Sequence, residues 1–184
     1  LTFQYNMVEF GKKIGTSDTL MAMFEREITE SIDSMTKAHK EGVPLLTGSE
    51  AGFSLVPYGD WHYREMEVFV KYFGMTPLEA IQCGTQKSAA GIRMEGEIGV
   101  IAKGYRADII CVTGKVEEDL SLLGNPDNIT TVMIQGVEKD LSPLPKRNRI
   151  PGWRLASIGD TRLTREVAYG EEQVQQAAFI EELH

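Results

Sequence analysis

This chain of 184 residues has few cysteines and no long apolar run. Cys83 and Cys111 lie far apart and form no Cys-x-x-Cys pattern, so we expect two reduced thiols in a core and a cytoplasmic location. No apolar segment approaches the roughly 18 residues of a transmembrane helix, and we expect no signal peptide. Basic residues are outnumbered, with 19 Lys and Arg against 27 Asp and Glu, so the net charge is −8. That balance argues against nucleic acids and anionic membranes as partners.

The composition is that of an ordinary soluble globular protein, with 42% apolar and 25% charged residues. The length suits one domain or parts of two. Because the first residue is Leu1 rather than Met, we expect the chain to be a piece of a longer protein.

A glycine-bounded stretch at residues 42–53 is the most informative part of the chain. Residues 43–46 form a short apolar run, which predicts a strand buried on both faces, as in a parallel α/β fold. Glu50 follows between Gly48 and Gly52, in the loop where such folds bind ligands. A carboxylate there can hold a metal or act as a base. The alternative is that Glu50 caps the next helix or lies in solvent.

Helical patterns flank this stretch. Ser17 can cap a helix that ends near His39, and a second helix is expected over residues 62–73. Thr76, Pro77 and Glu79 have the pattern of a capping box at the start of a third helix, which is expected to end at Gly91.

The rest of the chain has weaker or different patterns. Residues 1–16 are expected to be irregular, with a possible short strand at residues 1–5. Glycine-punctuated β patterns over residues 96–112 and 129–134 predict antiparallel strands with a turn at Gln135-Gly136. We expect an extended arm after residue 140 and a short helix from Glu171. The predicted divisions are therefore residues 1–92, 93–140 and 141–184.

Three motifs in this order resemble the last barrel strand and helices of the amidohydrolase superfamily. They are Thr47-Gly-Ser-Glu-Ala-Gly, then His62 with Arg64-Glu-Met-Glu, then Gly74-Met-Thr-Pro-Leu-Glu-Ala. The likeness is greatest to the imidazolonepropionase-like and Xaa-Pro-dipeptidase-like branch, which includes amide, carbamate and urea hydrolases. Gly99-Val-Ile-Ala-Lys-Gly-Tyr-Arg-Ala-Asp-Ile-Ile is similar to that family's return into a small β-sandwich. Together the matches span roughly residues 17–140.

The resemblance implies the C-terminal part of a (β/α)8 barrel followed by part of a β-sandwich. It also implies hydrolysis of C–N bonds by water bound to one or two divalent metals, with Zn²⁺ the expected ion. Glu50 matches the family's aspartate, which ligates metal and transfers a proton. Glutamate is one methylene longer, so the substitution puts the ligand geometry in doubt rather than the acid–base chemistry.

The family's remaining metal ligands have no match in this chain. The histidines are His39, His62 and His184, and none belongs to a His-x-His pair. By the resemblance, the chain needs the missing N-terminal portion of the same protein to be active. The expected partners are therefore that portion, a small amide-like substrate and further copies in a homo-oligomer.

Three residues near Glu50 are candidates for substrate binding. His62 can reach a substrate carbonyl or carboxylate, or bond to nearby backbone at a helix start. Arg64 can clamp a carboxylate, or pair with Glu65 or Glu67 on the surface. Tyr58 can line a pocket, or pack on the barrel rim. Ser49 and Ser54 have no evident histidine partner, which weakens a serine-hydrolase hypothesis.

Two other functions remain open from the sequence. A catalytically inactive relative could use the same fold for binding or scaffolding, with Glu50 marking the loss of metal. A self-standing α/β domain could share the likeness in structure alone.

Overall fold

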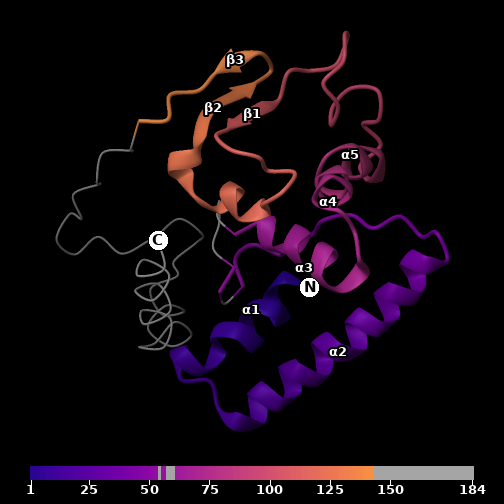
Figure 1. Cartoon of the computed structure of the whole chain (residues 1–184), viewed down its shortest axis with the longest axis vertical. Coiled ribbons are helices and arrows are strands. Elements are labelled where there is room, and N and C mark those ends of the chain that lie inside the picture. Colours follow the sequence, from indigo (N-terminus) through magenta and orange to yellow (C-terminus); the bar gives the residue numbers. More distant parts are fainter. Residues whose placement is uncertain (54, 57–60, 143–184) are drawn as a thin grey trace, which may run out of the picture.

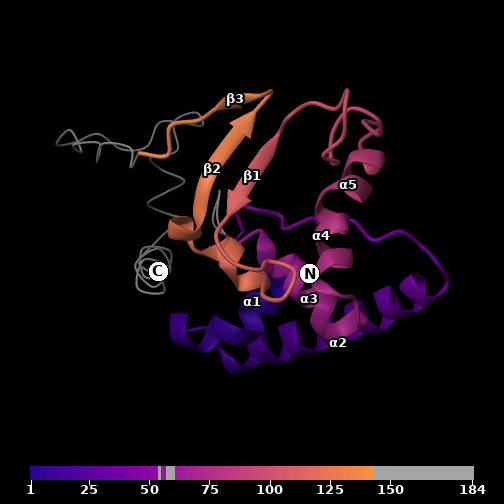
Figure 2. The same cartoon turned by 45° about the horizontal axis from the view of Figure 1, so that its top comes forward.

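The computed structural model describes residues 1–53, 55–56 and 61–142, in which helices are followed by a small sheet. Figure 1 shows α1, α2 and α3 in the lower part of the molecule, with the sheet above them and α4 and α5 beside it. Figure 2 shows the sheet standing over the helices. The predicted order, with helices first and antiparallel strands later, is confirmed. The helix predicted from Glu171 and nearly all of the arm predicted after residue 140 lie outside the described residues.

The start of the chain is helical, so the prediction of irregular structure with a possible strand was wrong. Thr2–Phe10 form α1, and Gly11–Ile14 form the 3₁₀ helix η1. Apolar residues at positions 3, 7, 10 and 14 recur at helical spacing and pack against Phe24 and Trp61. The ring of Phe3 meets that of Phe24 edge to face, with centroids 5.3 Å apart.

The long helix α2, Asp18–Lys40, confirms the helix predicted after Ser17. The Ser17 side chain accepts a hydrogen bond from the Leu20 amide, 3.4 Å away, and so caps the helix. The buried stripe of this helix begins at Met21, which is 5% exposed, whereas Leu20 is 46% exposed. No helix within the described residues combines the length and apolarity needed to cross a membrane.

Residues 43–46 are extended but form no strand, so the prediction of a doubly buried strand was wrong for this structure. Leu45 is buried in the main core, whereas Val43 and Leu46 are 50% and 40% exposed. A buried strand needs a hydrogen-bonded strand on each side. The described strands pair only with one another and leave this segment without such neighbours.

Three shorter helices follow the Glu50 loop: α3 (Tyr63–Phe73), α4 (Pro77–Gly84) and α5 (Gln86–Gly91). The predicted capping box is present, with Glu79 N–H donating to Thr76 Oγ1 at 3.2 Å and Thr76 N–H donating to Glu79 Oε2 at 2.8 Å. The hydrogen bonds that the Thr76 amide and hydroxyl donate to the Glu79 carboxylate lower the pKa of Glu79. The helix predicted to run to Gly91 is interrupted at Thr85, where the backbone leaves helical geometry.

The sheet is antiparallel, with strand order β1-β2-β3. Its strands are β1 (Ile109–Val112), β2 (Ile129–Ile134) and β3 (Val137–Glu138). The turn at Gln135-Gly136 is confirmed, with both residues at positive φ. Cys83 is buried as predicted, but Cys111 is exposed on β1. The described residues do not cover this face of β1.

Residues 98–101, expected within the β region, form no strand and pass close to the end of α4. At Gly99, φ is +84°, and an added Cβ would lie 2.8 Å from the Thr85 carbonyl oxygen. Gly96 has a similar φ of +86° but open space around it.

These two glycines give a matched stability test. We expect Gly96→Ala to cost about 1 kcal/mol, the cost of a left-handed backbone for a non-glycine residue. Gly99→Ala should cost roughly 2–3 kcal/mol, because the backbone clash adds to that cost. Denaturant unfolding of the two variants measures the difference. Equal losses would show that the close approach at Gly99 is unimportant.

Candidate active site

The loop that carries Glu50 runs from the extended segment at residues 43–46 to the start of α3. Glu50 is exposed and has a φ of +53°, in the left-handed region. Leu55 and Trp61 in the same loop have φ values of +55° and +56°. Such conformations cost free energy for residues other than glycine, and they cluster at functional sites when their surroundings hold them in place.

Hydrogen bonds hold the described part of this loop that follows Glu50. Gly52 N–H donates to the Val56 carbonyl at 2.8 Å, and Val56 N–H donates to the Phe53 carbonyl at 3.0 Å. Asn6 of α1 donates from Nδ2 to the Leu55 carbonyl at 2.6 Å. Leu55 and Val56 are 2% and 0% exposed. The loop is therefore anchored in the core only a few residues after Glu50.

The first half of the loop is tied to α3 through a side-chain pair. Ser49 Oγ lies 2.6 Å from His62 Nδ1, within hydrogen-bonding distance. His62 therefore bonds to a side chain rather than to nearby backbone, and Ser49 does have a histidine partner. Sequence reasoning missed both facts, because the two residues are 13 positions apart and only the fold of the loop joins them.

Arg64 is buried, and the predicted pairing with Glu65 or Glu67 was wrong. Its Nε donates to Asn6 Oδ1 at 2.6 Å, and its Nη2 pairs with Glu9. The guanidinium also lies over three aromatic rings, with distances to the centroids of 4.9–5.4 Å: those of Tyr5, Phe10 and Trp61. These contacts hold α1 against α3.

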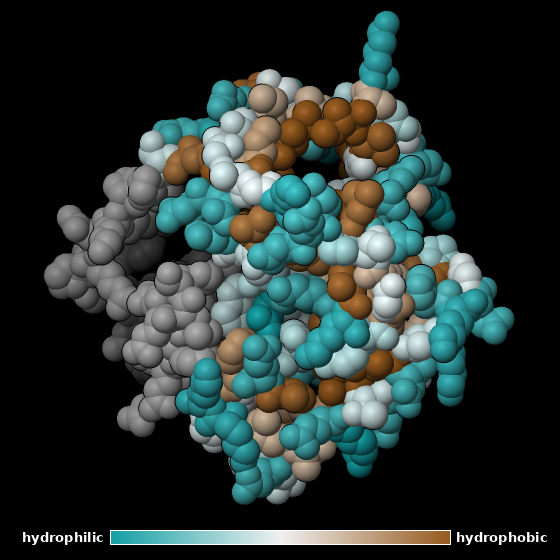
Figure 3. Space-filling view, viewed as in Figure 1, coloured by the Kyte–Doolittle hydropathy of each residue, from teal (hydrophilic) through white to brown (hydrophobic). Residues whose placement is uncertain are grey.

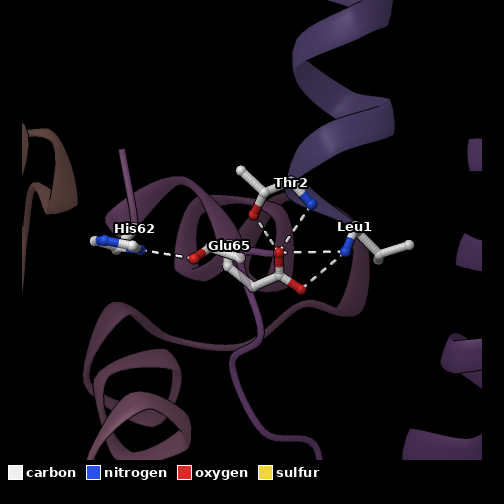
Figure 4. Close-up of polar contacts among 5 residues, drawn as sticks. Leu1, Thr2, His62 and Glu65 are labelled. Carbon is white, nitrogen blue, oxygen red and sulfur yellow. Dashed lines mark hydrogen bonds and ion pairs between the residues drawn. The ribbon is translucent and has the colours of Figure 1, made fainter. Parts of the chain in front are cut away.

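Glu65 also joins α1 to α3. Its carboxylate accepts hydrogen bonds from the Thr2 amide at 2.9 Å and from the Thr2 hydroxyl. The backbone nitrogen of Leu1 lies 3.0 Å from Glu65 Oε1. In Figure 4 this carboxylate points toward Leu1 and Thr2 and away from His62. Glu65 is therefore a docking residue for α1.

Glu67 is a half-buried carboxyl on α3. Burial raises its pKa above the ordinary value; the positive charge of Arg64 opposes this rise, whereas the negative charges of Glu9 and Asp119 add to it. None of these neighbours belongs to the Glu50 loop.

A cavity of about 580 Å³ lies between the helices and the sheet, with His62 in its lining. Most of its wall is apolar and includes Met66, Ile81, Ile110 and Ile129. Figure 3 shows exposed apolar side chains around a hollow in the upper part of the molecule, where Figure 1 has the sheet and α5. Tyr58, the third predicted substrate-binding residue, lies outside the described residues.

The described residues do not provide a complete metal centre. No group of three or more His, Cys, Asp or Glu side chains among them is arranged to hold an ion. Glu50 offers one carboxylate, and His39 lies in the last turn of α2, its ring packed near that of Phe73. A metal bound at Glu50 would need further ligands from other residues.

Comparison with known proteins identifies the family. The model of the amidohydrolase family matches residues 7–139, which is most of the chain, so this chain belongs to that family. An ochratoxinase from Aspergillus niger is 29% identical over 101 residues, covering 54% of this chain and 21% of that protein.

Solved structures show the same relationship. A Xaa-Pro dipeptidase with bound methionine superposes with a TM-score of 0.61 at 27% identity, over 76% of this chain and 33% of that one. The A. niger ochratoxinase structure has a TM-score of 0.57 at 26% identity, over 72% and 30%. The described structure therefore corresponds to part of an amidohydrolase fold. The chain spans about a fifth of the length of the ochratoxinase sequence and about a third of these solved chains.

Proposed function

We propose that this chain is the C-terminal part of a metal-dependent amidohydrolase that cleaves C–N bonds in small molecules. The bond is an amide, carbamate, urea or cyclic amide. The observation that carries the proposal is the exposed Glu50, in a left-handed conformation on an anchored loop, within a chain of the amidohydrolase family. The names of two similar proteins, an ochratoxinase and a Xaa-Pro dipeptidase, support a hydrolytic activity.

In this proposal Glu50 has two roles in the complete protein. It is one ligand of a divalent metal, with Zn²⁺ the expected ion, and it takes a proton from the attacking water and passes it to the leaving nitrogen. The metal, when bound, supplies Lewis acidity and lowers the pKa of water. Tyr58 is proposed to contact the substrate, whereas His62, the second contact expected from the sequence, has its Nδ1 at Ser49. Arg64 remains a predicted substrate contact, although the contacts described above show it joining α1 to α3.

Exposed apolar side chains support the idea that further residues complete the fold. Val43, Leu46 and Leu78 are 50%, 40% and 55% exposed. In a complete barrel, neighbouring strands would cover residues 43–46 on both sides. We propose that the preceding part of the same protein supplies those strands and the remaining metal ligands, and that residues 93–140 belong to a β-sandwich.

Metal removal tests this function. The complete protein, supplied with a panel of N-acyl amino acids and Xaa-Pro dipeptides, should release amine. Treatment with a chelator should abolish the release, and added Zn²⁺ should restore it, because the nucleophilic water depends on the metal.

The contrary result would be hydrolysis that survives complete metal removal, as measured by elemental analysis of the same sample. A protein that binds no metal and hydrolyses none of the panel would instead fit an inactive relative with a binding or scaffold role.

A further inference from the structure

A side-chain contact joins Ser49, the residue before Glu50, to the start of α3. Ser49 Oγ meets His62 Nδ1 at 2.6 Å, and His62 immediately precedes α3. This helix lies in the main core, where Val68 and Phe69 are fully buried. The imidazole is therefore placed at the start of a helix that packs in the core, and Ser49 lies within hydrogen-bonding distance of it.

The backbone of Glu50 needs such support. Its φ of +53° is a conformation that a glutamate would leave if its neighbours were free to move. On the C-terminal side, the anchors are the Gly52–Val56 hydrogen bond and the Asn6 contact to the Leu55 carbonyl. On the N-terminal side, the Ser49–His62 pair is the corresponding attachment. Glu50 is thus held between two fixed points.

We propose that His62 is a positioning residue, which acts through Ser49 to hold the Glu50 carboxylate in place. This inference rests on the proposed function, in which Glu50 is the working carboxylate. A carboxylate displaced by about 1 Å can lose on the order of 10² in rate, so the pair is expected to matter to activity without touching the reacting atoms. Partners that orient a metal ligand typically contribute 10- to 100-fold to metal affinity or activity.

The test uses Ser49→Ala, His62→Ala and the double variant in the complete protein. Three quantities are measured: hydrogen exchange of the amides at residues 50–53, bound metal per chain, and kcat with KM. We expect each single variant to speed exchange at residues 50–53 about tenfold and to lower metal affinity and kcat by about tenfold. The double variant should be no worse than either single variant, because both changes remove the same hydrogen bond.

Conservative variants separate positioning from substrate contact. The amide of His62→Asn reaches the place of Nδ1 and can keep the bond to Ser49, whereas that of His62→Gln reaches the place of Nε2. If His62 acts through Ser49, Asn restores exchange, metal content and kcat, and Gln does not. Rescue by Gln alone would overturn the proposal and assign His62 to substrate contact. His39→Ala and Ser34→Ala, in α2, are the matched controls and should change none of the three quantities.

The exchange measurement distinguishes failure of this inference from failure of the proposed function. Unchanged exchange at residues 50–53 in both alanine variants would overturn the positioning role, whatever happens to activity. Faster exchange with unchanged metal content and kcat would support the positioning of the loop and overturn the role of Glu50 in hydrolysis.

Discussion

Replacing Glu50 by Gln in the complete protein is expected to lower kcat for amide hydrolysis by at least about 10²-fold, the scale of a positioned acid–base group. The amide keeps the shape of the side chain but cannot accept the proton of the attacking water. Folding should change little, because the side chain is exposed and the volume is conserved. Turnover and thermal unfolding, measured on the same preparation, provide the check.

A second substitution at this position distinguishes two explanations for a glutamate where the resemblance implies an aspartate. If the loop backbone has adjusted to the longer side chain, Glu50→Asp will be too short and will also impair hydrolysis. If Glu50 is instead a residue that has lost the ability to bind the metal well, Glu50→Asp will raise metal content and turnover. Should Glu50→Gln leave both metal content and rate unchanged, Glu50 is not the working carboxylate.

Removing the Arg64 side chain is expected to cause a large loss of stability, because this charged side chain is buried between α1 and α3. Arg64→Ala should lower the free energy of unfolding by about 3 kcal/mol, because it removes a largely buried charge that joins Asn6 and Glu9 of α1 to α3. It also removes the packing of the guanidinium on three rings. Chemical denaturation of the complete protein measures the loss.

Arg26→Ala is the matched control for this change. Arg26 pairs with Glu30 at 3.9 Å within α2, and both side chains are about 70% exposed. Its loss should stay within about 0.5 kcal/mol. The two arginines therefore differ in burial more than in chemistry. An Arg64→Ala protein of unchanged stability but raised KM would instead support the substrate contact predicted from the sequence.

Local signals in the sequence were enough to place most helices. Ser17 and the Thr76–Glu79 box lie at the helix starts they predicted, because a cap depends on residues within one turn of each other. The motif order also identified the family, which the match over residues 7–139 confirms. The turn at Gln135-Gly136 was predictable for the same reason, since it needs only two residues that tolerate positive φ.

Contacts between distant residues were decided by the tertiary structure alone. Residues 43–46 have the composition of a buried strand, but a strand forms only beside another strand, and none of the described strands pairs with this segment. Arg64 is buried rather than at the surface because α1, where the sequence pattern predicts irregular structure, packs on α3. The sequence by itself determined that the carboxylate in the loop is Glu50. The tertiary structure decided that Ser49 and His62 meet beside it, because a contact between residues 13 positions apart depends on how the chain folds.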